Sequence, residues 1–289
     1  MQRTNRASGV LLVAVSAAAF GIMPIFAKLA YQTGASTYTL LFVRFACAAA
    51  VMFALVLARR LPLPSGRELA AYLLLGGAGY VGQSLCYFTA INHAASGTVS
   101  LLFYTYPALV MTGSVLVLGE RLTMRKALSL VLALGGAFLI VGGELSAEPL
   151  GIVLAFSAAG IYTVYILTSS RVIKPGMQLQ SSACIMLGAA IVFGVINCFT
   201  GFSPPHGAGG WLAAAAIALL CTAVAVAAFF IGMARTGPTT TSLVSTLEPV
   251  VTVLASALIL GERVTAVMLA GGVLILVSLF VTVAPEKNL

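Results

Sequence analysis

A chain of 289 residues with 61% hydrophobic and only 8% charged residues cannot form a water-soluble globule, because soluble domains carry about 25% charged residues. Its net charge of +8 would suit a nucleic-acid partner, yet the basic residues are spread over several short loops rather than gathered in one patch. The composition indicates a helical membrane protein that contacts the lipid bilayer and has no nucleic-acid partner.

Ten apolar stretches follow one another along the chain, each long enough to cross the hydrocarbon core of a bilayer. Short segments with Gly, Pro, Asn or charge separate them. The first stretch follows two arginines, as in a signal peptide, but its length and its likeness to the sixth stretch predict a retained helix. We therefore expect an all-α integral membrane protein with ten transmembrane helices, near residues 8–30, 36–58, 68–90, 95–118, 124–143, 149–170, 178–200, 211–233, 239–260 and 265–284.

The sequence contains an internal repeat with an offset of 142 residues. Residues 95–141 align with 237–283 without a gap, and the two copies share identical residues along their whole length. The match is closest where Leu118-Gly119-Glu120-Arg121 meets Leu260-Gly261-Glu262-Arg263. An internally duplicated membrane protein is typical of a transporter whose substrate site lies between its two halves.

Loop charges predict the orientation of the spans. With the N-terminus in the cytoplasm, nearly all loop arginines and lysines fall on the cytoplasmic side, and only Arg263 falls in an outer loop. Both termini are then cytoplasmic. Because five spans per repeat is an odd number, the second copy enters the membrane inverted. We expect one five-helix repeat over residues 1–146 and an inverted one over 147–289, together forming one transport domain.

These features resemble the drug/metabolite transporter superfamily, and within it the EamA-type family, over essentially the whole chain. The resemblance rests on a Pro in the fourth helix of each half, a Gly-Glu-Arg at that helix's end, Arg44, and the Asn92–Gly97 segment. It implies a multi-pass secondary transporter of the bacterial inner membrane. Similarity to bacterial exporters of aromatic and other amino acids implies export of amino acids or related metabolites. Multidrug or other metabolite efflux stays open, because the superfamily carries many solutes.

Polar and aromatic residues form one stripe of the third predicted span. Tyr80, Gln83, Ser84 and Tyr87 are spaced as i, i+3, i+4 and i+7, which places them on one helix face. Polar side chains within a membrane are costly unless they face the bundle interior or water. We expect this stripe to bind substrate, opposite the mostly apolar face in the eighth span that includes Phe229. Alternatively, the tyrosines only cross-link helices or lie at the membrane interface.

Prolines interrupt spans at corresponding positions of both halves. Tyr104, Tyr106 and Pro107 lie near the middle of the fourth span, and Pro249 follows Glu248 in the ninth. Proline removes a helical hydrogen bond, so kinks are expected there. We interpret Pro107 and Pro249 as hinges beside a central site that includes both tyrosines, although such kinks also occur for packing alone. Pro24 predicts a further bend in the first span.

Three charged residues lie inside predicted spans. Glu248 is the only acid well within one, which indicates either proton coupling, a contact with a substrate amine, or a paired structural group. Lys28 and Arg44 lie in the outer third of the first two spans. They either attract a substrate carboxylate or extend toward the outer membrane surface.

The remaining motifs predict no enzyme chemistry. Gly77-x-Gly79-x-x-Gly82 matches a dinucleotide-binding pattern, but it lies within an apolar helix without a preceding strand. Glycines at 76, 79 and 82 instead predict close helix packing. We therefore expect no catalytic residue, no metal and no cofactor. A passive channel or an intramembrane enzyme is the alternative class, and the sequence does not predict the oligomeric state.

Overall fold

The computed structural model describes residues 2–90, 93–94, 96–141, 148–261 and 263–283, and these residues contain helices and connecting segments but no strand. The helices are α1 Gln2–Gly21, α2 Met23–Gln32, α3 Thr37–Ala58, α4 Gly66–Leu74, η1 Leu75–Tyr80, α5 Val81–Ala90, α6 Ser96–Phe103, α7 Tyr106–Leu118, α8 Met124–Val141, α9 Pro149–Val172, α10 Gln178–Thr200, α11 Gly207–Ala218, η2 Leu219–Val224, α12 Ala225–Thr236, α13 Pro238–Ser245, α14 Glu248–Ala255, η3 Ser256–Leu260 and α15 Ala266–Val283.

Nine helical segments of the described chain are long and apolar enough to cross a membrane. Several consist of two or three consecutive helices; the first, for example, runs from Arg6 to Gln32 through α1 and α2. The last predicted span corresponds to a shorter apolar helix over Ala266–Thr282. The all-α class is thus confirmed, with nine full-length candidate spans where the sequence predicts ten.

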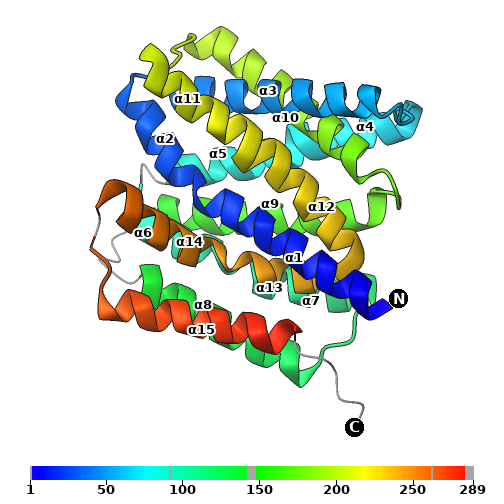
Figure 1. The fold of residues 1–289 in the computed structure, drawn as a ribbon, viewed down its shortest axis with the longest axis vertical. Coiled ribbons are helices and arrows are strands. Elements are labelled where there is room, and N and C mark those ends of the chain that lie inside the picture. Colours follow the sequence, from blue (N-terminus) through cyan, green and yellow to red (C-terminus); the bar gives the residue numbers. More distant parts are fainter. Residues whose placement is uncertain (1, 91–92, 95, 142–147, 262, 284–289) are drawn as a thin grey trace.

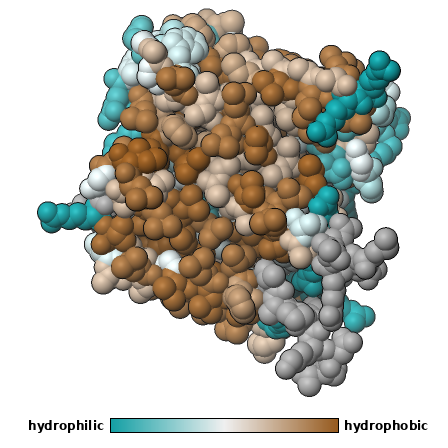
Figure 2. All heavy atoms as spheres, in the orientation of Figure 1, coloured by the Kyte–Doolittle hydropathy of each residue, from teal (hydrophilic) through white to brown (hydrophobic). Residues whose placement is uncertain are grey.

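The surface of the helices is largely apolar. Leu116, Leu258 and Phe280 expose 79–85% of their surface, although leucine and phenylalanine are usually buried in soluble proteins. In Figure 2, hydrophobic side chains cover the middle of the molecule, and hydrophilic ones gather mainly at its left and right margins. A wide apolar belt between two polar margins is the surface expected of a protein surrounded by lipid.

The most extensive helix contacts join the first part of the chain to the second. Helix α8 packs against α15, α3 against α10, α1 against α12 and α5 against α9 (Figure 1). The first and second parts of the sequence therefore interlock. The central cavity described below is therefore lined by residues from both parts of the chain.

Glycine allows the α4–η1 segment and α10 to approach closely. A Cβ atom added at Gly76 would overlap the carbonyl oxygen of Ile185 in α10, and one added at Gly188 would overlap that of Leu73. The sequence prediction of close packing at Gly76 is therefore confirmed. At Gly79 the neighbour is instead the Tyr165 side chain, whose Cδ2 would lie 3.0 Å from an added Cβ.

The predicted interruptions at proline are present. Helix α6 ends before Tyr104 and α7 carries Pro107 in its first turn, while α13 ends before Thr246 and α14 carries Pro249 in its first turn. A third break separates α1 from α2 beside Pro24. At two of the breaks a threonine hydroxyl adds a hydrogen bond to the carbonyl three residues earlier: Thr246 Oγ1 donates to Leu243 O at 2.6 Å, and Thr105 Oγ1 donates to Leu102 O at 2.7 Å.

Candidate functional site

A central cavity of about 1210 Å³ lies between the helices of both parts of the chain. It extends from the breaks beside Pro24 and Glu248 toward the end of α2 and the start of α15. Nine residues of the predicted site line it: Pro24, Lys28, Arg44, Tyr80, Gln83, Ser84, Tyr87, Tyr104 and Glu248. The stripe of the third span thus faces a cavity, as its spacing indicates.

Four other predicted residues lie outside the cavity wall. Tyr106 is only 1% exposed and packs edge-on against Tyr162, with ring centroids 5.0 Å apart. Phe229 is also buried, against Phe230 at 5.6 Å. Pro107 and Pro249 lie at the helix breaks, behind residues that do line the cavity.

Arg44 links both parts of the chain at the cavity wall. It lies on α3 and is 4% exposed, so its side chain does not extend to a membrane surface. Its Nε donates to Thr222 Oγ1 at 2.7 Å, and its Nη2 donates to the Tyr80 hydroxyl at 3.2 Å. Tyr80 and Thr222 differ by 142 residues, so one guanidinium binds the same repeat position in both copies.

The two residues that hold Arg44 lie in π-helical turns. Tyr80 ends η1, and Thr222 lies within η2. The wider π turn leaves carbonyls without their usual partners, and Thr222 Oγ1 donates to one of them, Ile217 O, at 2.8 Å. Because Thr222 also accepts from Arg44, its hydroxyl fixes both the local backbone and the guanidinium.

Aromatic rings form another wall of the cavity. The Tyr87 hydroxyl is 2.9 Å from Ser100 Oγ, and its ring packs against Phe103 with centroids 5.3 Å apart. Phe103 in turn contacts Tyr162 at 5.5 Å. Rings with polar tips suit a solute that is partly aromatic and partly charged.

Basic and acidic side chains both line the cavity. Lys28, Arg44 and Arg263 are cationic, and Glu248 is the one acid among the described lining residues. Glu248 is the first residue of α14, where the helix dipole favours a negative charge. The wall can therefore bind a carboxylate and an amine at the same time, with an excess of positive groups.

Sequence reasoning missed several lining residues, among them Phe20, Ser100, Phe103, Tyr162 and Arg263. The internal repeat could have identified two of them, because Phe20 and Tyr162 are separated by the repeat offset of 142 residues and are both aromatic. The described residues contain no group of three metal-ligating side chains. The lining offers charged, polar and aromatic groups that can bind a solute.

Comparisons with known proteins agree with this architecture. The chain is 26% identical over 284 residues to the uncharacterized transporter YcbK of Bacillus subtilis (strain 168), covering 92% of this chain and 89% of that protein. It is 26% identical over 251 residues to the aromatic amino acid exporter YddG of Ancylobacter novellus, covering 78% of this chain and 86% of that protein.

A solved structure, described only as a crystal structure of a protein, has the same fold. Its TM-score is 0.84 at 22% identity, with 95% of this chain and 98% of that chain covered. The model of the EamA-like transporter family matches residues 7–142 and again residues 149–284. The chain therefore belongs to the EamA-like transporter family, within the drug/metabolite transporter superfamily.

Proposed function

We propose that this chain is a secondary transporter that exports amino acids with aromatic or apolar side chains by alternating access. The observation that carries the proposal is the composition of the central cavity wall. Guanidinium, carboxylate and tyrosine groups face one space, which matches the three parts of an aromatic amino acid. The similarity to a relative named as an aromatic amino acid exporter supports the same substrate class.

Each part of the cargo has a partner in the proposed binding mode. Arg44 binds the carboxylate, because a guanidinium has five N–H donors and its two known bonds leave others unused. Glu248 binds the ammonium group. The side chain of the cargo packs among the rings of Tyr87, Phe103 and Tyr162. These rings form a row along the wall, and the centroids of neighbouring rings are 5.3–5.5 Å apart.

The proposal includes the membrane architecture expected from the sequence. Two inverted five-helix repeats, over 1–146 and 147–289, contribute ten spans, with both termini in the cytoplasm. The central cavity then reaches the outer surface at Lys28 and Arg263, and the breaks beside Pro107 and Pro249 act as hinges. Two family matches of similar length, over 7–142 and 149–284, support this division.

Counterflow in proteoliposomes tests the proposal. Vesicles loaded with unlabelled phenylalanine are diluted into labelled phenylalanine, and a carrier gives a transient, saturable accumulation of label. Tyr87→Ala and Gln83→Ala should each lower this flux at unchanged membrane insertion. A passive channel would instead give flux that does not saturate and no counterflow. Flux without saturation, or the absence of counterflow, would contradict the proposal.

Multidrug efflux is the competing cargo class, because Glu248 would bind the cation of a drug. Three cationic groups around one carboxylate favour a zwitterion over a cation. Labelled organic cations added to the same assay separate the two. Transport of cations without transport of phenylalanine would favour the competitor.

A further inference from the structure

A second cavity, of about 290 Å³, lies at the C-terminal end of helix α9, whereas the central cavity is lined by the middle of that helix. Tyr162 of α9 lines the central cavity, whereas Ser169, Ser170 and Arg171, two turns further on, line the second. The ends of α7 and α12 and the start of α13 complete its wall. Arg235, in that wall, donates to Ser8 near the start of α1, which places the cavity at the N-terminal end of the first span.

Aromatic rings separate the two cavities. Tyr162 stacks on Tyr165, with centroids 5.8 Å apart and planes 14° from parallel, and Tyr165 contacts Phe230 at 6.1 Å. Phe230 then lines the second cavity. Tyr165 and Phe230 are 3% and 1% exposed, so this row of rings closes the passage between the cavities.

A polar group in the second cavity lacks a partner. Ser169 is fully buried, and its Oγ forms no hydrogen bond within the described part of the chain. The adjacent Ser170 differs, because its hydroxyl donates to Leu167 O at 2.7 Å. A buried hydroxyl without a partner destabilises the fold, because it has lost its hydrogen bonds to water. A ligand that accepts a hydrogen bond from Ser169 would recover that energy.

The charges around this cavity favour an anionic group. Arg171 donates to Val117 O and Arg235 donates to Ser8 Oγ at 3.0 Å, and each guanidinium has further N–H donors. The described lining contains no acid. Phe230 and Met233 provide an apolar surface beside these groups. The combination suits a carboxylate attached to an apolar body.

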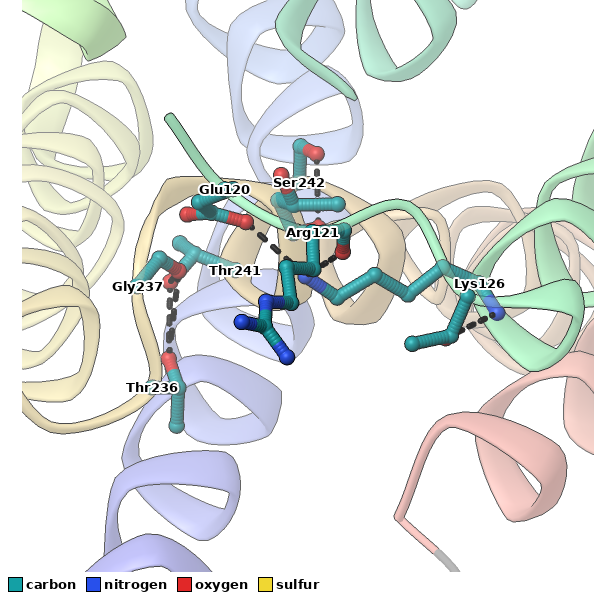
Figure 3. A network of polar contacts seen from close by, with 9 residues as sticks. Glu120, Arg121, Lys126, Thr236, Gly237, Thr241 and Ser242 are labelled. Carbon is teal, nitrogen blue, oxygen red and sulfur yellow. Dashed lines mark hydrogen bonds and ion pairs between the residues drawn. The ribbon is translucent and has the colours of Figure 1, made fainter. Parts of the chain in front are cut away.

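The cavity is bounded by the Gly237–Pro238 turn between α12 and α13, which lies beside the α7–α8 connection of the first part of the chain. Gly237 has φ +81°, and a Cβ added there would lie 3.2 Å from Glu120 Oε1 in the α7–α8 connection. Lys126 Nζ binds Glu120 Oε2 at 2.9 Å, and the hydroxyls of Thr236 and Thr241 are 2.9 Å apart (Figure 3). The Glu120 carboxylate, paired with Lys126, therefore lies beside the Gly237–Pro238 turn.

We propose that the second cavity is a loading site that binds the carboxylate of the cargo amino acid at the N-terminal side of the membrane, before the rings of Tyr165 and Phe230 separate. Ser169, Arg171 and Arg235 bind the carboxylate, and Phe230 contacts the side chain. The cargo then reaches the central cavity along the row that ends at Tyr162. This inference rests on the proposed amino-acid export.

Cysteine protection tests the loading site. Leu118→Cys, which lines the cavity from the end of α7 and takes no part in the proposed binding, is reconstituted in the full chain into vesicles, treated from either side with a membrane-impermeant maleimide, and analysed by mass spectrometry at residue 118. We expect labelling only from the side of the N-terminus, slowed at least five-fold by saturating phenylalanine but not by phenethylamine, which lacks the carboxylate. Native Cys184, buried and outside both cavities, serves as the unlabelled control.

Several outcomes overturn the inference. Labelling without protection by phenylalanine, in vesicles that still show phenylalanine counterflow, removes the loading site and leaves the proposed function intact. Protection by glycerol phosphate but not by phenylalanine assigns the cavity to a lipid headgroup. Absence of both counterflow and protection removes both proposals together. If the cysteine at 118 prevents insertion, Ile173→Cys reports on the same cavity from the end of α9.

Discussion

Replacing Thr222 by valine tests whether Arg44 binds the cargo carboxylate. Valine keeps the shape of threonine but removes the hydroxyl that accepts from Arg44 Nε at 2.7 Å and donates to Ile217 O at 2.8 Å. Thr222 is fully buried, so water does not replace the lost acceptor. The guanidinium then keeps only the longer bond to Tyr80, at 3.2 Å, and is less well oriented toward the cavity.

The expected loss follows from the type of bond. A hydrogen bond to a charged group contributes about 1.5–3 kcal/mol in proteins, whereas hydrogen bonds between membrane helices reach at most about 1.7 kcal/mol. We take about 1–1.7 kcal/mol as the cost of reorienting Arg44 when the carboxylate binds. This corresponds to a five- to twenty-fold weaker affinity for phenylalanine. Tyr80→Phe removes the longer bond and should weaken binding about three-fold, from about 0.6 kcal/mol.

Binding of labelled phenylalanine to the purified protein measures this effect. Thr222→Ser keeps the hydroxyl and should remain within two-fold of the unsubstituted chain. Phenylalaninamide, which has no carboxylate, should compete equally well in both proteins. If Thr222→Val weakened the amide and the acid alike, the residue would act through the fold, and the role of Arg44 in carboxylate binding would be refuted.

Three further substitutions follow from the same structure. Glu248→Gln removes the group proposed to bind the ammonium, so phenylalanine efflux from loaded vesicles should fall; unchanged efflux excludes this contact, and an unchanged response to an imposed pH gradient excludes proton coupling through this residue. Gly76→Leu should prevent folding, seen as loss of a monodisperse peak on gel filtration, because its side chain would displace the backbone at Ile185, while Gly135→Ala, with open space around it, should be tolerated. Tyr87→Phe keeps the ring but loses the contact with Ser100, so flux should fall less than in Tyr87→Ala.

Patterns with a strong physical cause were predictable from the sequence. Hydropathy predicted the bounds of the membrane-length helices to within a few residues, because a bilayer requires a minimum apolar length. The prolines predicted the helix breaks before Pro107 and Pro249, because proline lacks the N–H that would continue the helical hydrogen bonds of the preceding helix. The i, i+3, i+4, i+7 spacing from Tyr80 to Tyr87 gave the face that lines the cavity.

Contacts between distant segments were not predictable in this way. Arg44 meets Thr222 only because α3 packs beside η2, and no local pattern reveals that pairing. Tyr106 has the same aromatic character as Tyr104, yet packing of α7 against α9 buries its ring outside the cavity wall. Glu262 of the second Gly-Glu-Arg motif lies outside the described residues.

Locating a bound cargo molecule tests the central claim most directly. Crystals of the protein grown with 4-iodophenylalanine would give an anomalous signal at the iodine atom. We predict a peak among the rings of Tyr87, Phe103 and Tyr162, with the carboxylate at Arg44. A peak on the outer apolar surface only, from a protein that still carries out phenylalanine counterflow, would contradict the central cavity as the transport site.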